Sequence, residues 1–346
     1  MNVKRNLLYI LTVVLLPLAF ASCSKDKDDD SKQKPVITMT VEATATEIVT
    51  GVKGNGTAVI DWGDGDTANI TLTSEVRLYE HTYTASSNSR IVTITDGKIL
   101  ALDCGENHLT ALNISTSVDL TYLDCGDNKL TSLDLSANIA LTEIDCSANL
   151  LTALDLSKNT LLENLLCSNN KLTALNLSKN TSLQSLHCYN NSLTSLDISK
   201  NTLLEYLDYS DNQLPDLNVG KNTQLKSLYC INNIITTLDV GKNTLLEVLY
   251  CGFNQLESLN VSKNTLLNDL DCANNQLTDM DLTENVELLY VDCAYNLLSA
   301  EALDALFETV HDNREQEIEK SMLISNNPGT DGCHKTIAES KGWTVN

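Results

Sequence analysis

Basic residues are scarce in this chain of 346 residues, which has 23 lysines and arginines against 46 aspartates and glutamates. The resulting formal net charge of −23 repels phosphate backbones and anionic lipid headgroups at long range. We therefore expect neither a nucleic-acid partner nor direct contact between the folded part of the chain and a membrane.

Catalytic motifs are missing as well. The sequence has no HExxH, no GxSxG, no phosphate-binding glycine loop and no paired carboxylates of the kind that line an active-site cleft. The neighbouring pair Cys333-His334 lacks a third group, and a nucleophile needs a base that is oriented against it in space. We predict that the protein is not an enzyme and that it needs no cofactor and no metal.

The N-terminus has the pattern of a secretory signal, because two basic residues precede an apolar run that ends at Ala21. That run is too short to indicate a membrane-spanning helix. Phe20-Ala21-Ser22-Cys23 resembles the lipobox of bacterial lipoproteins, in which the cysteine is acylated and becomes the mature N-terminus. The resemblance implies a signal peptide over 1–22 and lipid attachment at Cys23. Ordinary cleavage near Ala21, with Cys23 left as a free thiol, is the alternative.

Residues 23–33 form a polar, charged run that cannot bury apolar area, so we expect an acylated acidic tether. An acidic run beside an acylated cysteine resembles the surface-export signal of lipoproteins in some diderm bacteria. The resemblance implies an outer-membrane protein that is held by its lipid anchor alone and faces outward.

A spacing of 21 residues organises most of the cysteines, and Tyr209 occupies the one vacant position of the series. Self-similarity at a fixed period is a strong signal for a repeat fold. Parallel side chains on adjacent strands suit disulfides poorly, and neither CxxC pairs nor clustered histidines suggest a metal. We therefore expect small apolar core side chains, and a sixth repeat that either accommodates the larger ring or turns it outward. The series is Cys104, Cys125, Cys146, Cys167, Cys188, Cys230, Cys251, Cys272 and Cys293.

The repeated pattern LxxLxCxxNxLxxLDLxxNxx resembles the short bacterial variety of leucine-rich repeats over about 200 residues. The resemblance implies a mainly β protein with a solenoid over 98–298. Alternate residues of a strand face opposite sides, so Leu123 and Cys125 should point inward while Tyr122 and Asp124 point outward.

Two polar columns accompany the repeat. One is always asparagine, and we expect its amides to replace hydrogen bonds that the turning backbone would otherwise lack. The other alternates Asp with Asn from Asp155 onward, which separates like charges; we favour structural electrostatics, helped by nearby lysines, over a calcium ladder. The first column is Asn107, Asn128, Asn149, Asn170, Asn191, Asn212, Asn233, Asn254, Asn275 and Asn296; the second is Asn113, Asp134, Asp155, Asn176, Asp197, Asn218, Asp239, Asn260 and Asp281.

Residues 34–97 alternate in the manner of β-strands. The segments Asp61-Trp62-Gly63-Asp64-Gly65-Asp66 and His81-Thr82-Tyr83 resemble motifs of the PKD domain, an immunoglobulin-like β-sandwich, although Ser86–Ser89 departs from the expected glycine turn. The resemblance implies a spacer, which would also cap the solenoid. The three aspartates could bind Ca²⁺, but a tight turn that needs Gly and Asp explains them more simply.

Residues 299–346 break the period and predict a small α/β cap, because an open solenoid end would expose its core and its strand edge. Ser299 can N-cap a helix through 300–311. The sequence predicts strands over 321–325 and 343–345 and a short helix over 335–340.

We expect the residues that depart from the repeat pattern, rather than the repeat itself, to carry the function. Aromatic and apolar residues gather on one strand face over the fifth to eighth repeats, and exposed tyrosines on a sheet often mark recognition. The alternative is that cross-strand tyrosines only stabilise the sheet. The predicted ligand-binding residues are His187, Tyr189, Tyr206, Asp208, Tyr229, Ile231, Val248, Tyr250 and Phe253.

The sequence therefore predicts a cell-surface lipoprotein that binds a protein or peptide partner, in adhesion or recognition, through the strand face of its solenoid. Two alternatives remain open at this point. Aromatic residues flanked by Asp and Asn would also suit a surface glycan, and a structural stalk or spacer would need no ligand.

Overall fold

The computed structural model describes residues 36–84, 88–312 and 319–346. They belong to one compact unit, Lys34–Asn346. The predicted signal peptide, tether and Cys23 lie outside the described residues, as do residues 86 and 87 of the segment where a PKD-like turn is expected. Within the described part of the chain, no helix has the length and apolar character that crossing a membrane requires.

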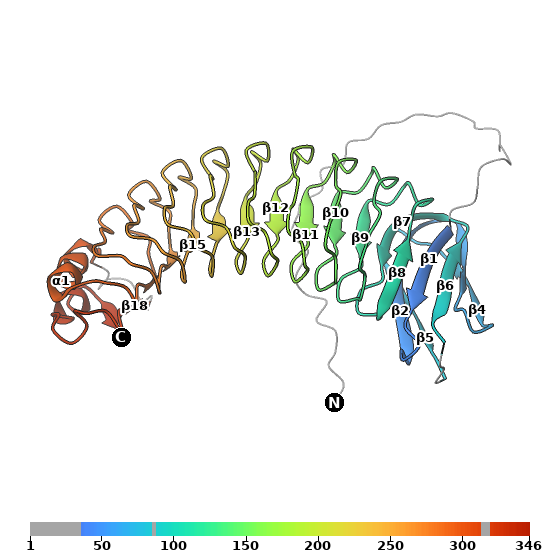
Figure 1. Ribbon diagram of the computed structural model, residues 1–346, viewed down its shortest axis with the longest axis horizontal. Coiled ribbons are helices and arrows are strands. Elements are labelled where there is room, and N and C mark those ends of the chain that lie inside the picture. Colours follow the sequence, from blue (N-terminus) through green and yellow to red (C-terminus); the bar gives the residue numbers. More distant parts are fainter. Residues whose placement is uncertain (1–35, 85–87, 313–318) are drawn as a thin grey trace. The chain divides into compact units, whose positions relative to one another are not determined.

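Eight strands form two antiparallel arrangements in the N-terminal part of this unit (Figure 1). One sheet has the order β4-β3-β6-β1-β8, and β5-β2-β7 begins the other. Alternate residues of strands such as β1 are buried, and the inward side chains of both sheets join a single hydrophobic core. The strands are β1 (Val36–Val41), β2 (Glu47–Asn55), β3 (Thr57–Asp61), β4 (Thr67–Thr71), β5 (Arg77–Thr82), β6 (Arg90–Thr95), β7 (Lys98–Asp103) and β8 (Leu109–Asn113).

The first repeat contributes a strand to each of these sheets. Strand β7 pairs antiparallel with β2 on one side and parallel with β9 on the other, so the N-terminal sheet continues without a break into the solenoid. Strand β8 pairs with β1 of the second sheet. The predicted boundary at residue 98 therefore falls between two strands that lie in packed sheets, where the chain has no linker.

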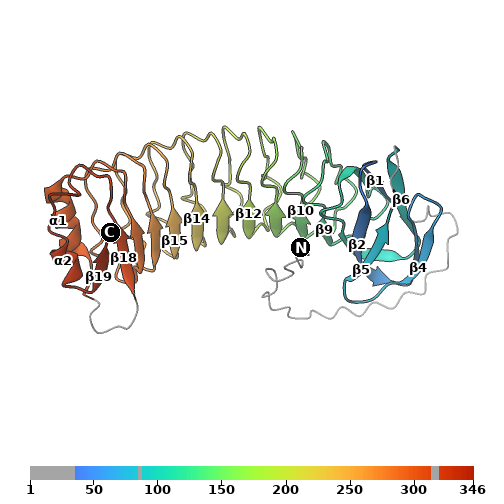
Figure 2. The ribbon, with the colours of Figure 1, turned by 90° about the horizontal axis from the view of Figure 1, so that it is seen from below.

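Nine strands of three residues each follow in parallel, one per repeat, and they lie side by side in Figure 2. Neighbouring strands pair in a constant register that places each central apolar residue opposite the next, as in Leu207 opposite Leu228. The central residue is buried in every strand, and its two neighbours are half-buried. The strands are β9 (Tyr122–Asp124), β10 (Glu143–Asp145), β11 (Asn164–Leu166), β12 (Ser185–His187), β13 (Tyr206–Asp208), β14 (Ser227–Tyr229), β15 (Val248–Tyr250), β16 (Asp269–Asp271) and β17 (Tyr290–Asp292). The mainly β solenoid predicted from the 21-residue period is confirmed.

The invariant asparagine column makes the hydrogen bonds to the turning backbone that the sequence predicts. The Asn149 Nδ2 atom donates to the carbonyl oxygens of Cys125, Cys146 and Ser147 at 2.9, 3.2 and 3.0 Å, and its Oδ1 accepts from the Leu130 N–H at 2.9 Å. The same bonds recur along the column, which we call the first asparagine ladder. A buried turn whose backbone groups lack partners would cost free energy in every repeat, and the ladder removes that cost.

A second asparagine ladder, not predicted from the sequence, holds the opposite turn of each repeat. Asn159 is fully buried, and its Nδ2 donates to the carbonyl oxygens of Leu135 and Asn138 at 3.2 and 2.9 Å. Its Oδ1 has no hydrogen-bond partner. The amides of the second ladder thus donate hydrogen bonds through nitrogen but accept none through oxygen. Its members are Asn138, Asn159, Asn180, Asn201, Asn222, Asn243, Asn264 and Asn285.

The nine cysteines of the repeat are all free and fully buried, as expected for core side chains. Burial raises the pKa of thiols such as Cys167 well above the ordinary value, so they are poor metal ligands and nucleophiles. The ring of Tyr209 does not turn outward; it is fully buried in the same column. The Tyr209 hydroxyl lies beside the Cys230 thiol, but the two groups do not have the geometry of a hydrogen bond.

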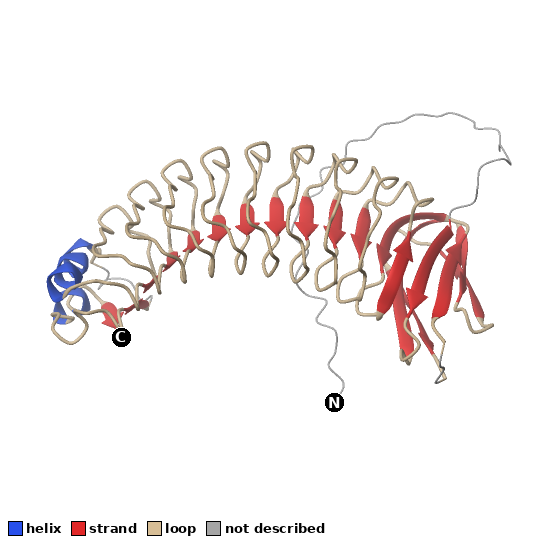
Figure 3. Cartoon of the chain, in the orientation of Figure 1, coloured by secondary structure: helices blue, strands red, loops and turns tan. Residues whose placement is uncertain are grey.

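The last part of the chain carries the described helices, α1 (Ala300–Thr309) and α2 (Thr336–Glu339), which Figure 3 shows in blue. Ser299 N-caps α1 by accepting from the Ala302 N–H at 3.2 Å. Strands β18 (Lys320–Leu323) and β19 (Trp343–Val345) extend the parallel sheet.

Asn327 adds a further step to the first ladder, which the sequence analysis ended at Asn296. Its Nδ2 donates to the carbonyl oxygens of Cys293 and Ile324, both at 2.9 Å. The hydrogen bonding of the repeat therefore continues beyond the point where its sequence pattern breaks.

Removing one member of each ladder should have unequal effects. We expect Asn149→Ala to lower the free energy of unfolding by about 3 kcal/mol, because the buried Leu130 N–H loses its acceptor and three backbone carbonyls each lose one of their two donors. Asn159→Ala should cost about 1 kcal/mol less, because it also removes an unpaired buried oxygen. Urea unfolding followed by circular dichroism measures both. Equal losses would mean that the two ladders contribute alike.

Candidate functional site

Most of the predicted ligand-binding residues lie on neighbouring strands, and three lie just beyond the strand ends. Tyr189, Ile231 and Phe253 follow β12, β14 and β15 in the turns. The others lie in β12–β15: His187, Tyr206, Asp208, Tyr229, Val248 and Tyr250.

Four of these rings form a continuous row across the strands. The His187 and Tyr206 rings stack with centroids 4.3 Å apart, Tyr206 lies 5.3 Å from Tyr229, and Tyr229 meets Tyr250 edge-on at 5.1 Å. We call these four side chains the aromatic row. Each is half-buried, so part of each ring stabilises the sheet and part remains exposed. Burial lowers the pKa of His187, which favours the neutral ring.

Three members of the aromatic row stand at a position where aspartate would stabilise the fold. Where the third strand residue is aspartate, its Oδ1 accepts from the backbone N–H two residues on, as Asp145 does from Ser147 and Asp271 from Ala273, both at 2.9 Å. His187, Tyr229 and Tyr250 stand in that column and give up this bond. The repeat alone therefore does not account for their presence.

Phe253 is a second departure that the fold does not favour. It occupies the turn position that adopts the left-handed backbone conformation in every repeat, with φ of 54°. Asn and Asp tolerate that conformation, whereas a bulky side chain is strained there. The Phe253 side chain is 55% exposed and so gains little by burial. A strained, exposed aromatic residue is an observation that favours a binding role.

Carboxylates dominate the rest of the strand face, by which we mean the first and third residues of β9–β17. None of these nine strands contains a lysine or an arginine. The strand-face carboxylates are Asp124, Glu143, Asp145, Asp208, Asp269, Asp271 and Asp292.

The strand face holds these carboxylates at a free-energy cost. Burial, followed by repulsion from Asp145, Asp103 and Glu106, raises the pKa of Asp124 to about 7, although the Gly126 N–H acts in the opposite direction. Burial likewise raises the pKa values of Asp208 and of other members of the set. Charged carboxylates are therefore less stable here than in water.

The second polar column is structural. Asp155 and Asp281 each accept from the backbone N–H two residues on, at 2.9 Å, and both are exposed. Backbone and side-chain hydrogen bonds from Ser157, and then the nearby Lys158, lower the pKa of Asp155. These contacts account for the column by local turn geometry and counter-charge, as the sequence analysis favours.

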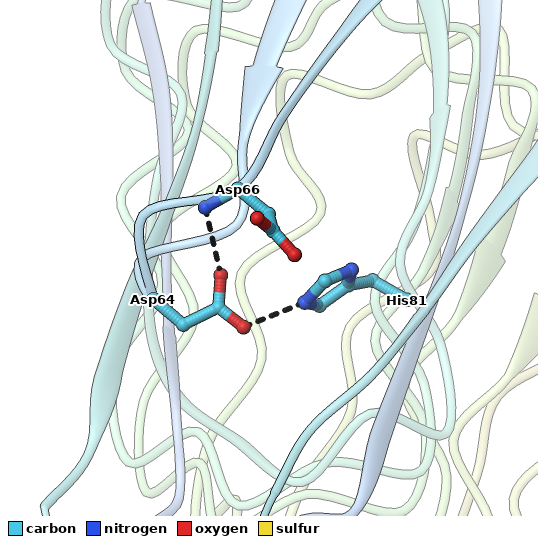
Figure 4. Close-up of side chains that lie close together, drawn as sticks. All are labelled: Asp64, Asp66 and His81. Carbon is cyan, nitrogen blue, oxygen red and sulfur yellow. Dashed lines mark hydrogen bonds and ion pairs between the residues drawn. The ribbon is translucent and has the colours of Figure 1, made fainter.

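The aspartates at the end of β3 and in the loop to β4 also stabilise a turn. Asp61 accepts from the Gly63 N–H at 2.9 Å, and Asp64 accepts from the Asp66 N–H at 3.1 Å. Figure 4 shows that His81 joins them, because its Nε2 lies 2.7 Å from the second oxygen of Asp64. Ligand atoms of Asp64, Asp66 and His81 lie within 4.8 Å of one another and could hold a metal ion. The sequence alone does not indicate that His81 belongs to this group.

Cys333 and His334 do not form a catalytic pair. The His334 Nδ1 atom lies 2.7 Å from Asp304 Oδ2, whereas the Cys333 thiol donates to the Thr330 carbonyl at 3.4 Å. Burial raises the pKa of Cys333, which disfavours the reactive thiolate.

Comparison with known proteins places the solenoid in a fold class. No protein-family model and no curated protein sequence matches the chain. The functional domain of InlJ from Listeria monocytogenes, which includes a cysteine ladder, is 37% identical with a TM-score of 0.61; the match covers 67% of this chain and 50% of that one. The chain thus spans half the length of the InlJ structure.

Two further structures share the fold alone. The internalin InlF from Listeria monocytogenes is 21% identical over 72% of this chain and 88% of that chain, with a TM-score of 0.54. A leucine-rich-repeat protein from Leptospira interrogans is 18% identical over 70% and 83%, with a TM-score of 0.52. The described solenoid is therefore a leucine-rich-repeat fold, and its structural neighbours are leucine-rich-repeat proteins rather than enzymes.

Sequence reasoning missed the acidic character of the strand face as a whole. Glu143 and Asp269 are the first residues of their strands, whereas the other strand-face carboxylates are third residues. The signal was present in the sequence, because these strand positions contain seven carboxylates and neither lysine nor arginine.

The raised pKa of Asp124 predicts a pH dependence of stability. An aspartate with a folded-state pKa near 7 favours the fold most below about pH 4, where both states are protonated, and this contribution is lost as the pH rises to about 7. Asp124→Asn keeps an acceptor for the Gly126 N–H and removes the charge. We expect the variant to unfold at higher urea than the parent at pH 8, by on the order of 1 kcal/mol, and to match it at pH 4. A constant difference across that range would contradict the assignment.

Proposed function

We propose that this protein recognises a protein or peptide partner at a bacterial cell surface, through the strand face over β12–β15. The observation that carries the proposal is the aromatic row, in which four rings contact one another on consecutive strands. Leucine-rich-repeat neighbours are consistent with a role in protein recognition.

Tyrosine suits such a surface for a physical reason. Its ring supplies a large contact area at a small entropic cost, and its hydroxyl supplies a polar handle. The ring contacts also restrict the side chains before a partner arrives, which reduces the ordering that binding requires. His187, Tyr229 and Tyr250 give up the aspartate hydrogen bond, and Phe253 has a strained backbone. Because neither feature stabilises the fold, both support a role in binding.

The proposal includes the location of the protein. Acylation at Cys23 would anchor the chain in the outer membrane, facing outward, with residues 34–97 acting as a PKD-like spacer and cap. Supporting evidence is the lipobox-like sequence and the acidic run after it. Mass spectrometry of the N-terminal peptide tests the anchor, since acylation adds lipid mass to Cys23.

Two double variants test the recognition surface. We expect Tyr229→Ala with Tyr250→Ala to abolish binding of the full chain to its partners on an array of host proteins, peptides and glycans. Tyr122→Ala with Tyr290→Ala removes two half-buried tyrosines of the same strand face outside the aromatic row, and it should leave binding nearly unchanged.

Thermal melts of both variants control for unfolding. Binding that survives loss of Tyr229 and Tyr250 would contradict the proposed surface. If the array gives only glycan ligands, the partner class is wrong although the surface stands; if it gives none, the stalk is the better account.

A further inference from the structure

The strand face has an unbalanced charge that its own neighbours do not neutralise. Seven carboxylates lie on β9–β17, and these strands contain no lysine or arginine. The basic side chain nearest along the chain to β14, Lys226, is already paired with Glu205 at 2.6 Å. The set therefore carries a net negative charge that is open to a partner.

A metal ion does not fit this arrangement. Within the described part of the chain, the one group of side chains that converges closely enough to hold an ion is Asp64, Asp66 and His81, and none of these lies on the strand face. The strand-face carboxylates are spread along the solenoid instead, and many bind their own turn through one oxygen. Such spacing suits an extended partner with several positive charges.

Six of the seven charges fall into two groups with the aromatic row between them, and Asp208 on β13 lies beside the row itself. Glu143 and Asp145 lie on β10, and Asp269 and Asp271 lie on β16. Six strand-to-strand steps separate β10 from β16, which is about 29 Å at the usual spacing. The Tyr250 hydroxyl donates to Asp269 Oδ2 at 2.9 Å, so the aromatic row is connected directly to the second group.

We propose that the partner is a polypeptide whose Lys or Arg side chains contact these two acidic groups while its intervening residues lie on the aromatic row. This inference rests on the proposed function and specifies its ligand. In an extended chain, about nine residues span the 29 Å between the groups. Guanidinium groups suit the site well, since each can donate two hydrogen bonds to a carboxylate and can also contact a tyrosine ring.

Binding would also relieve a cost that the free protein carries. Burial, and then repulsion from neighbouring carboxylates, raises the pKa values of Glu143 in the first group and Asp271 in the second. A positive charge placed among them stabilises their ionised form. The same charge would have no such effect on the exposed aspartates of the second polar column, whose pKa values are lowered.

Designed peptides test the inference on the full chain in detergent. The first probe is a fluorescent peptide with two Arg pairs nine positions apart in an uncharged sequence; the second has the same composition with all four Arg residues adjacent; the third has Glu in place of Arg. Fluorescence anisotropy should show the spaced Arg peptide binding about ten-fold more tightly than the adjacent one, and the Glu peptide not binding.

Matched variants separate a specific site from general attraction to an acidic protein. Asp145→Asn with Asp271→Asn should weaken binding of the spaced peptide about ten-fold or more. Asp155→Asn with Asp281→Asn removes the same charge from the second polar column, where each aspartate accepts an equivalent backbone bond at 2.9 Å, and should change binding less than about two-fold. Equal losses in the two variants, or no binding of the spaced peptide, would overturn the inference.

The outcome is distinguishable from failure of the proposed function. A partner found on the array that is lost with Tyr229→Ala and Tyr250→Ala, but retained with Asp145→Asn and Asp271→Asn, would refute the basic ligand and leave the recognition surface standing.

Discussion

The structure depends on the hydrogen bonds that the first asparagine ladder makes at the end of each strand. A repeat of 21 residues must turn sharply within the protein interior, and each turn leaves backbone carbonyls and N–H groups without partners. One amide per repeat satisfies them, and Asn327 extends the same bonding past the last regular repeat. Because the turns are satisfied, the strands stack in constant register, and the leucines and cysteines share one core.

Much of the fold could be predicted from the sequence, because a residue type that recurs at the same position of every repeat indicates what that position requires. A column that is always asparagine indicated backbone bonding, and evenly spaced cysteines indicated core positions. The second ladder was missed because its asparagines stand in a turn rich in Ser, Lys and Thr, where a polar residue is ordinary and burial is not visible. The place of Tyr209 could not be decided either, since burying its hydroxyl depends on space that no local pattern reports.

The candidate site was less accessible to sequence reasoning than the fold. The pattern identified His187, Tyr206, Tyr229 and Tyr250 as departures, and the structure adds that their rings touch. The structure also shows what His187, Tyr229 and Tyr250 give up, since an aspartate in their position accepts a hydrogen bond from the following turn. The acidic strand face is visible only when both outward columns are taken together, because most of its carboxylates, taken singly, accept a backbone hydrogen bond from their own turn.

The account separates residues that build the solenoid from residues that are free to recognise a partner, and one measurement tests that separation directly. Amide hydrogen exchange of the chain should be slow throughout the strands β9–β17 and their ladder-bonded turns in the free protein. When a bound partner is added, further protection should concentrate between β10 and β16. Protection confined to β1–β8, or to the turns of the second polar column, would contradict the account.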